Sequence, residues 1–267
     1  MTLCLPLLRA RERKGVAPNR LTKTMSDLQR IFEHIAARNK WRNRESRSGD
    51  GSTLFYTRHL RSRLEAFVRE FEVRTFFDAP CGDFNWMRAV AFPPRVTYMG
   101  GDIAPSLIKQ NRKRHAGPRR RFLQFDIVSD PFPEADVWFC RDCLFHLPHD
   151  LIFRALRNFS DSKIKLVMMT NHINKHGFPN IDAQAGGFRL VDFFSPPFNL
   201  PRDVLYRVVD YIEPYPPREM CVWTREQVAE ALAQAPDLSE EVAECADSGE
   251  EVVGRHCEER SDEAIHS

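Results

Sequence analysis

Two hydrophobic patterns divide the chain, and the first is helical. Between residues 25 and 72, apolar residues recur three and four positions apart, which is the spacing of one face of an α-helix. We expect one helix over 25–41, with Ser26 or Asp27 as its N-cap, and a second over 52–71. A Ser- and Gly-rich loop joins the two helices.

The second pattern begins at Val73, where short apolar runs alternate with amphipathic ones. Short apolar runs bounded by turn residues indicate buried strands, and the longer amphipathic runs between them indicate helices. The expected strands are 73–79, 96–102, 121–127, 135–142 and 164–172, and the expected helices are 85–92, 106–115 and 147–159. This alternation predicts an α/β fold with a central, mostly parallel sheet and helices on both faces.

The pattern changes again after residue 175. The segment 186–201 is rich in aromatic residues and proline, which predicts a loop instead of a regular element. We expect the last sheet strands within 203–224. A final helix over 224–235 would have Thr224 as its N-cap.

Length and composition are those of a folded protein. The chain has 267 residues, of which 42% are hydrophobic and 28% charged, enough for one sizeable core. No stretch approaches ~20 consecutive apolar residues, so we expect no membrane span. The basic residues near the start follow the short apolar run, the reverse of a secretory signal. Seven irregularly spaced cysteines fit reduced thiols, and we expect a cytoplasmic protein. Only Cys140 and Cys143 form a Cys-x-x-Cys pair, so we expect no metal site.

The charges are unevenly distributed, although the net charge is only +2. The first seventy residues are rich in Arg and Lys, and the last forty are rich in Glu and Asp. Trp41, Phe55 and Tyr56 lie among the arginines, a combination that can bind RNA. A run of charges is more often a solvated face, so a nucleic-acid partner is the lesser expectation.

Carboxylates follow successive strands of the predicted sheet. Asp78, Asp102 and Asp126 each end an expected strand, with 24 positions from one to the next, and Asp142 ends a fourth. Ligands of open parallel sheets bind at the carboxyl ends of the strands, where the strand order reverses. We therefore expect these four acidic side chains to line one crevice.

The turn after the first strand excludes a phosphate ligand. It reads DAPCGDF from Asp78, contains Gly82 as its one glycine, and lacks the G-x-G-x-x-G pattern of dinucleotide sites. Carboxylates at Asp78 and Asp83 would repel a pyrophosphate, so a cationic ligand without phosphate fits better. Asp102 lies where such folds bind both ribose hydroxyls, and Asp126 could accept a hydrogen bond from the adenine amine.

An adenosine with a cationic amino-acid tail is S-adenosylmethionine, and the sequence resembles the class I S-adenosylmethionine-dependent methyltransferases. It most resembles a bacterial group with the motif D-x-P-C-G-D-F-x-W, here Asp78 to Trp86. The resemblance also covers Trp41 with the Ser-Gly loop from Ser48 to Ser52. Two further matching stretches are CRDCLFHL at 140–147 and GGFRLVDFFSPPFNLP at 186–201.

The resemblance implies a Rossmann-like fold and a set of cofactor contacts. Cys81 and Gly82, between Asp78 and Asp83, would surround the methionine part. Asp102 would bind the ribose, and Ile103 would pack on the adenine. The remaining cofactor positions implied are Asp126 and Ile127 at the adenine edge and Arg141 after the fourth strand. Cys81 also fits a small packed residue, and that interpretation stays open.

The resemblance also indicates where an acceptor would bind. Methyl transfer needs alignment and desolvation, and it needs a base only when the acceptor carries a proton. His146 and His172 are the candidate bases, and Asp142 could orient His146 or accept a proton itself. Residues expected to contact the acceptor are Asn171, Phe188, Arg189 and Trp41. His146 also fits a satisfied, half-buried histidine.

The expected organisation has four regions: residues 1–24 as a disordered or non-native start, 25–72 as a helical cap, 73–235 as the S-adenosylmethionine-binding domain, and 236–267 as an acidic disordered tail. The expected reaction is methyl transfer to an oxygen or nitrogen of a small-molecule or saccharide acceptor. An RNA methyltransferase and an inactive cofactor-binding module remain alternatives. The missing Gly-rich phosphate loop argues against a nucleotide-linked oxidoreductase.

Overall fold

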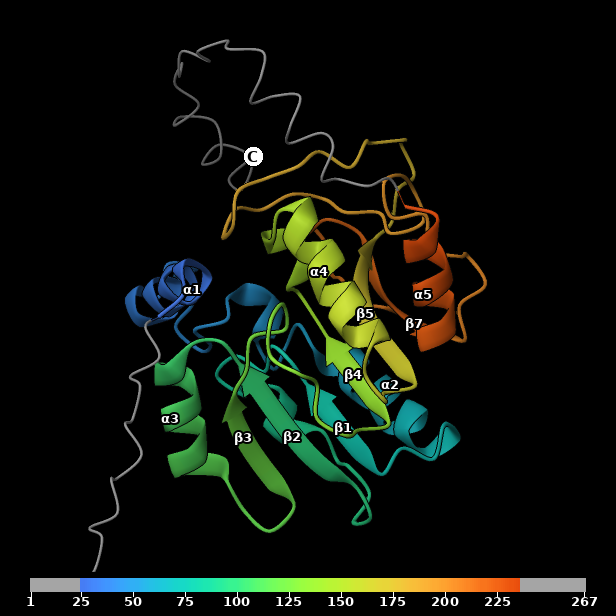
Figure 1. Cartoon of the computed structure of the whole chain (residues 1–267). Helices are drawn as coiled ribbons and strands as arrows, with labels where there is room; N and C mark the ends of the chain where they lie inside the picture. Colours follow the sequence, from blue (N-terminus) through green and yellow to red (C-terminus); the bar gives the residue numbers. More distant parts are fainter. Residues whose placement is uncertain (1–24, 236–267) are drawn as a thin grey trace, which may run out of the picture.

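A computed structural model describes residues 25–235 of the chain (Figure 1). The expectations for residues 1–24 and 236–267 lie outside the described residues. The described part has one seven-stranded sheet with the strand order β3-β2-β1-β4-β5-β7-β6. Its strands are β1 Thr75–Asp78, β2 Thr97–Asp102, β3 Arg120–Gln124, β4 Val137–Cys140, β5 Leu166–His172, β6 Tyr206–Val209 and β7 Arg218–Thr224.

The sheet is mostly parallel, as the alternating pattern predicts. Strands β3, β2, β1, β4 and β5 run parallel to their neighbours, whereas β7 is antiparallel to both β5 and β6. All five parallel strands therefore end at one edge of the sheet. The strand order reverses between β1 and β4, which is the point at which open α/β sheets generally bind their ligands.

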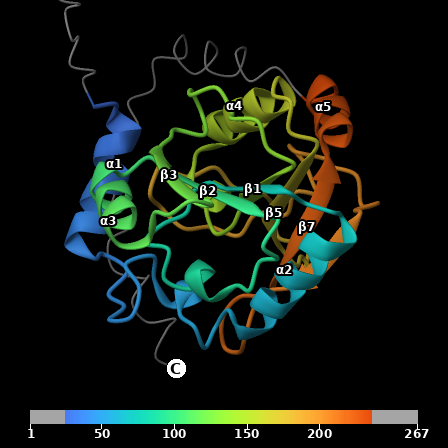
Figure 2. The ribbon, with the colours of Figure 1, turned by 90° about the horizontal axis from the view of Figure 1, so that it is seen from below.

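Helices cover both faces of the sheet (Figure 2). The helices are α1 Asp27–Arg38, α2 Arg58–Glu70, α3 Pro105–His115, α4 His149–Ser160 and α5 Arg225–Ala233. Helices α4 and α5 pack on one face and α2 packs on the other, while α1 lies against α3 beside the edge formed by β3. None of the described helices is long and apolar enough to cross a membrane.

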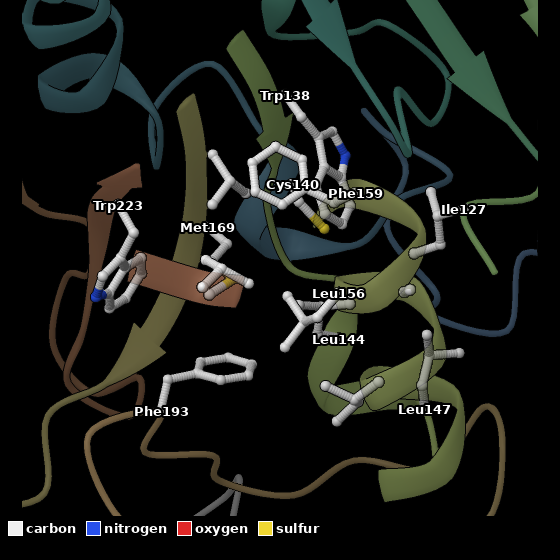
Figure 3. Packing of buried hydrophobic residues seen from close by; sticks show 14 of the residues in the cluster. Ile127, Trp138, Cys140, Leu144, Leu147, Leu156, Phe159, Met169, Phe193 and Trp223 are labelled. Atoms are coloured by element: carbon white, nitrogen blue, oxygen red, sulfur yellow. The ribbon is translucent and has the colours of Figure 1, made fainter. Parts of the chain in front are cut away.

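Large aromatic residues fill the layer between the sheet and helix α4 (Figure 3). Trp138 of β4 lies 4.8–5.5 Å from Phe132 and Phe159, measured between ring centroids. Its indole N–H donates to the carbonyl of Ala79, so the polar edge of a fully buried side chain is satisfied. This bond ties the end of β1 to its neighbour β4, directly below the candidate crevice.

The expected helix ends agree with the structure where a cap determines them. The side chain of Ser26 accepts a hydrogen bond from the N–H of Gln29 and caps α1. Thr224 and Gln227 form a reciprocal capping box at the start of α5. Helix α2 begins at Arg58 and not near residue 52, because the preceding residues form turns and the short 3-10 helix Asp50–Ser52.

The helix expected over 85–92 is wrong. Only a 3-10 turn, Met87–Ala89, forms there. Pro93 and Pro94 follow at once, and proline disfavours helical geometry in the residue before it. Trp86 still packs into the core from this irregular segment, which explains why its hydrophobic pattern resembles that of a helix.

Two strands are shorter than expected, which moves two carboxylates beyond them. Strand β3 ends at Gln124. Asp126 follows two residues later, and its carboxylate accepts hydrogen bonds from the N–H of Val128 and the hydroxyl of Ser129. Strand β4 ends at Cys140, and Asp142 follows in the left-handed region at φ 50°. A non-glycine residue in that region is uncommon and often belongs to a functional site.

Candidate active site

The carboxyl ends of β1, β2, β4 and β5 form the base of the candidate site. Asp78 and Asp102 are the last residues of β1 and β2, and His172 is the last residue of β5. Asp142 lies two residues past β4, beside Thr170 of β5, whose hydroxyl accepts its N–H at 2.8 Å. The structure thus brings together three of the four predicted acidic positions with both candidate histidines at one edge of the sheet.

Asp102 holds the turn after β1 in place. Its two carboxylate oxygens accept the N–H groups of Gly82 and Ala104, both at 2.9 Å. Burial raises the pKa of this carboxyl to about 6, although these two hydrogen bonds favour the ionised form. Gly82 adopts φ 54°, a left-handed geometry that glycine reaches without a steric penalty. Ile103, the next residue along the chain, is partly exposed.

Asp78 is buried and bonded to a tyrosine. The hydroxyl of Tyr98 donates to its carboxyl group at 2.5 Å. Burial raises the pKa of Asp78 to about 8, and the hydrogen bond from Tyr98 offsets only part of this shift. The side chain is therefore largely a neutral acid near pH 7.

The Ser-Gly loop between α1 and α2 lies against the turn after β1 and bonds to Asp83. The hydroxyl of Ser46 and the N–H of Arg47 donate to the two carboxylate oxygens of Asp83, at 3.0 and 2.7 Å. The Ser48 hydroxyl in turn accepts the N–H of Asp83 at 3.4 Å. A Cβ atom on Gly82 would lie 2.2 Å from that hydroxyl, so only glycine fits there. Sequence reasoning matched this loop to the family pattern but did not foresee the role of Ser46 and Arg47.

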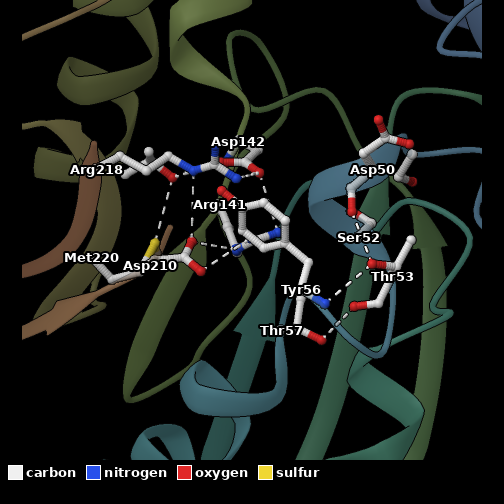
Figure 4. A network of polar contacts seen from close by, with 12 residues as sticks. Asp50, Ser52, Thr53, Tyr56, Thr57, Arg141, Asp142, Asp210, Arg218 and Met220 are labelled. Carbon is white, nitrogen blue, oxygen red and sulfur yellow. Dashed lines mark hydrogen bonds and ion pairs between the residues drawn. The ribbon is translucent and has the colours of Figure 1, made fainter. Parts of the chain in front are cut away.

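Two arginines and two aspartates form a buried charge cluster below the cap (Figure 4). Arg141 binds Asp210 through two nitrogens, at 2.7 and 3.2 Å. Its third nitrogen lies 3.2 Å from Asp142, and Arg218 of β7 also bonds to Asp142, at 2.9 Å. The side chains of Arg141 and Asp210 are only 3% and 2% exposed, so this pair is almost fully removed from water.

The contacts within this cluster determine the protonation state of Asp142 and the role of Arg141. Burial raises the pKa of the Asp142 carboxyl, but the two guanidinium groups more than offset this and hold it below its usual value. Asp142 is therefore ionised and is a weak proton acceptor. All three guanidinium nitrogens of Arg141 face carboxylates, so this residue supports the structure around the site.

The segment between α1 and α2 also lies against the charge cluster. The ring of Tyr56 lies 4.9 Å from the guanidinium carbon of Arg218 and 5.8 Å from that of Arg141. A Cβ atom on Gly51 would lie 2.8 Å from a nitrogen of Arg218 and 3.0 Å from an oxygen of Asp142. Sequence reasoning missed Asp210, Arg218 and the part played by Tyr56, because no local motif links them to the strand ends.

His146 and His172 differ in the nitrogen that carries the hydrogen. The Nδ1 atom of His146 lies 2.6 Å from the carbonyl oxygen of Gly187, so Nδ1 must donate and Nε2 keeps a lone pair. The Nδ1 atom of His172 accepts the N–H of Val191 at 3.1 Å, so its Nε2 carries the hydrogen. Among the described residues, that Nε2 is buried without a hydrogen-bond partner.

Both histidines are neutral near pH 7. Burial lowers the pKa of His146, and the hydrogen bond to Gly187 opposes this only in part. Burial, with the nearby Arg218, lowers the pKa of His172 to about 4. His146 can therefore accept a proton at Nε2, whereas His172 can only donate a hydrogen bond from its own.

Aromatic rings surround His146. Trp41 of the cap lies 5.6 Å from it between ring centroids, and Phe188 lies 6.2 Å from it on another side. Phe188 is 58% exposed, which is unusual for a large apolar side chain. Three residues expected at the acceptor or its base, from three distant parts of the chain, thus lie side by side.

Two of the other predicted acceptor residues hold the backbone of the site. Asn171 is buried, accepts the N–H of Phe193 at 2.7 Å and donates to the carbonyl of His172. The guanidinium group of Arg189 donates to the carbonyls of Phe145 and Leu147, on either side of His146. Both side chains are occupied by main-chain partners in this structure.

Of the remaining predicted cofactor residues, Asp126 makes local hydrogen bonds, whereas Ile127 and Cys81 are buried. The Asp126 carboxylate accepts from the N–H of Val128 and the hydroxyl of Ser129. Ile127 is buried in the core beneath α4. Cys81 is also buried, which raises the pKa of its thiol and makes it a poor nucleophile. No group of three or more His, Cys, Asp or Glu side chains within residues 25–235 is placed to hold a metal ion.

Comparisons with known proteins show the fold. No protein-family model matches the chain, and no curated protein matches it. The N-methyltransferase NodS from Bradyrhizobium japonicum WM9, solved with S-adenosyl-L-homocysteine, matches with a TM-score of 0.53 and 13% identity, over 74% of this chain and 98% of that one. The methyltransferase domain of bacterial CtHen1 matches with a TM-score of 0.50 and 14% identity, over 63% of this chain and 98% of that one.

The chain has the Rossmann-like methyltransferase fold. The likeness covers 74% and 63% of this chain, whose described part contains the seven-stranded, mostly parallel sheet. At such low identity the likeness concerns the fold alone, and the chemistry must be argued from the residues at the strand ends. In this Rossmann-like methyltransferase fold, the side chains described above gather at the edge of the sheet where the parallel strands end.

Removing one member of the charge cluster should be strongly destabilising. We expect Asp210→Ala to lower the free energy of unfolding by about 3–5 kcal/mol, because Arg141 is left buried without its main partner. Urea denaturation followed by circular dichroism measures this. The control is Glu134→Ala, which breaks the exposed pair with Lys163 and should leave the midpoint unchanged. Equal, small effects for both variants would contradict a structural role of the cluster.

The neutral state of Asp78 gives a pH-dependent prediction. Its folded pKa of about 8 lies above the unfolded value near 4, so its contribution to stability is lost as the pH rises between these values. The variant Asp78→Asn has no ionisable group at this position, so its stability does not fall with pH for this reason. The free energy of unfolding of this variant, relative to the wild type, should therefore increase from pH 4 to pH 8. Urea titrations at several pH values measure it, with exposed Asp161→Asn as the flat control. A difference that does not vary with pH would show that Asp78 is ionised in the folded protein.

Proposed function

We propose that the protein is an S-adenosylmethionine-dependent methyltransferase that acts on an oxygen or nitrogen of a small-molecule or saccharide acceptor. The observation that carries this proposal is Asp102, a buried carboxylate at the carboxyl end of β2, bonded to the N–H of Gly82 in the turn after β1. A carboxylate at this point of the fold suits the two hydroxyl groups of a ribose. The turn beside it offers a single glycine and two acidic residues, which suits a ligand without phosphate.

The residues around the turn fit such a cofactor. Ile103, partly exposed beside Asp102, offers an apolar contact for the adenine. Asp78 and Asp83 lie on either side of Gly82, and a cationic amino-acid group near them would favour their ionised forms. The absence of a Cβ atom on Gly82 leaves its backbone accessible once the Ser48 hydroxyl moves aside. We keep Cys81, Asp126, Ile127 and Arg141 as neighbours of the cofactor, in positioning roles.

The chemistry assigned to the chain is alignment and proton transfer. Bound S-adenosylmethionine would supply an electrophilic methyl group, and its C–S bond would break as the acceptor's lone pair forms the new bond. His146 would take the acceptor's proton at Nε2, because its Nδ1 hydrogen is used by Gly187. The Nε2 hydrogen of His172 would orient the acceptor. Asp142, held ionised by Arg218, would favour the protonated form of His146 after transfer.

The acceptor proposal rests on the aromatic surroundings of His146. Trp41 and the exposed Phe188 lie on two sides of it, a setting that suits the apolar face of a sugar or a small ring system. Asn171 and Arg189 support this wall through the main chain. An RNA acceptor and an inactive cofactor-binding module are the alternatives, and the following experiments separate the inactive module from an active enzyme.

The regional organisation is part of the proposal. We assign residues 25–72 to a cap and residues 73–235 to the cofactor-binding domain, because the loop from Ser46 to Ser52 lies over the turn after β1. We place the activity in the cytoplasm. The four cysteines within the described residues (Cys81, Cys140, Cys143 and Cys221) are all free, as a reducing compartment requires.

Asp102→Ala tests the cofactor site directly. Calorimetric titration of the wild type with S-adenosylmethionine and S-adenosylhomocysteine should give micromolar binding, with NADH as a negative control. Asp102→Ala should weaken that binding by about 1–3 kcal/mol, because the ribose hydroxyls lose their acceptor. Exposed Asp161→Ala is the matched control and should bind as the wild type does. Binding of NADH alone, or no effect of Asp102→Ala, would contradict the proposed cofactor site.

His146→Ala tests the proposed base. Transfer of a labelled methyl group from S-adenosylmethionine to a panel of sugars and small phenols identifies an acceptor. With that acceptor, His146→Ala should lower kcat by about 10²–10⁴-fold while the Kd for the cofactor stays within about twofold. Exposed His59→Ala should change neither quantity. A parallel loss of cofactor affinity would make His146 a structural residue, and absence of transfer to every acceptor, with intact binding, would favour the inactive module.

A further inference from the structure

A second charged region lies away from the strand ends just described. Between Asp102 and Asp126 the sequence has seven Lys and Arg residues and no carboxylate. Six of them, which we call the α3–β3 basic surface, occupy the end of α3 and the start of β3: Arg112, Lys113, Arg114, Arg119, Arg120 and Arg121. Figure 1 shows that α3 and β3 lie side by side at one edge of the sheet.

The cations of this surface are exposed and have no ion-pair partner. All six residues are exposed, and none of them pairs with a carboxylate within residues 25–235. Arginines elsewhere in the described part, such as Arg30, Arg207 and Arg225, do have acidic partners. The surface is therefore a local excess of positive charge in a chain whose net charge is only +2.

Packing holds part of this surface in a fixed arrangement. The Nε of Arg112 donates to the carbonyl of Phe122 at 2.7 Å, which joins the end of α3 to β3. The ring of His115 lies 5.2 Å from that of Phe84, and the guanidinium carbon of Arg120 lies 6.0 Å from the same ring. Burial and the charges of Arg120, Arg88 and Arg114 lower the pKa of His115, because these three cations lie around its ring.

Stability of the fold explains only some of these charges. Cations in the last turn of α3 interact favourably with the helix dipole. The three consecutive arginines from Arg119 to Arg121 lie at the start of a strand, where no such dipole exists. Their mutual repulsion is unfavourable in the isolated protein, so an external anion is the natural partner.

We propose that the α3–β3 basic surface binds the phosphodiester backbone of a nucleic acid. Five of the seven cations between Asp102 and Asp126 are arginines, whose planar groups match phosphate oxygens in pairs. A membrane surface fits less well, because none of the exposed large hydrophobic residues of the described chain lies between Asp102 and Asp126. Arg121 pairs in register with Met99, three residues before Asp102, so the surface begins about 10 Å along the strands from the proposed ribose carboxylate. It is a binding site separate from the proposed acceptor pocket and does not depend on the proposed reaction.

The test is a salt titration of binding. The full chain is titrated against a fluorescein-labelled RNA of about 20 nucleotides, by fluorescence anisotropy, from about 50 to 200 mM KCl. The variant Lys113→Gln/Arg114→Gln/Arg121→Gln should weaken binding at least about tenfold. It should also reduce the slope of log K against log [KCl] by about 2–3, because three phosphate contacts are lost. A second variant, Lys109→Gln/Arg119→Gln, should reduce the slope by a smaller amount in the same direction.

The matched control removes the same charge elsewhere. Arg38→Gln/Arg69→Gln/Arg154→Gln neutralises three exposed arginines outside this surface and should bind RNA as the wild type does. Equal losses for the control and the first variant, or no loss for either, would overturn the proposal. Binding of polyglutamate, or of phosphatidylcholine vesicles with one quarter phosphatidylserine, with the same dependence on the basic surface would also overturn it in favour of a general anion site. Thermal unfolding of each variant verifies that the fold is retained.

Discussion

The buried pairing of Arg141 with Asp210 is the interaction on which the candidate site depends. Removing two such charges from water costs several kcal/mol for each ion, and their attraction recovers this only with good geometry. Here the geometry is bidentate, and the remaining nitrogen faces Asp142. An apolar set of side chains could provide similar stability. The charged pairs also fix where these residues lie, because they join the residues after β4 to the strands β6 and β7 at the far side of the sheet.

The position of Asp142 determines the electrostatic environment of the two histidines. Asp142 is held at a positive φ by bonds to Thr170 and Arg218, and it lies close enough to influence the pKa values of His146 and His172. A different main-chain group determines which nitrogen of each ring carries the hydrogen. This group is the carbonyl of Gly187 for His146 and the N–H of Val191 for His172. Two residues of the same type thus acquire opposite hydrogen-bonding capacities. The distinction comes from the irregular segment between β5 and β6, which lies against both rings.

Much of the fold could be predicted from the sequence because periodicity and strand-end residues are local signals. The mostly parallel sheet, with Asp78 and Asp102 at the ends of its strands, follows from alternation and from the rules of parallel sheets. The expected helix over 85–92 failed because burial of Trp86 imitates a helical pattern in an irregular segment. The charge cluster could not be predicted, because Asp210 and Arg218 meet Arg141 only after a long excursion of the chain. The hydrogen positions of the histidines likewise depend on contacts 19 and 41 residues away.

The Ser-Gly loop has one more consequence, which concerns how the two halves of the site communicate. Ser48 rests on Gly82, where the methionine end of a cofactor would lie, and the neighbouring Gly49 packs against the side chain of Trp41. Trp41 in turn forms one wall around His146. The loop therefore contacts the turn after β1 through Ser48 and the side chain of Trp41 through Gly49. A substitution that moves this loop away from Gly82 would therefore also change the surroundings of His146.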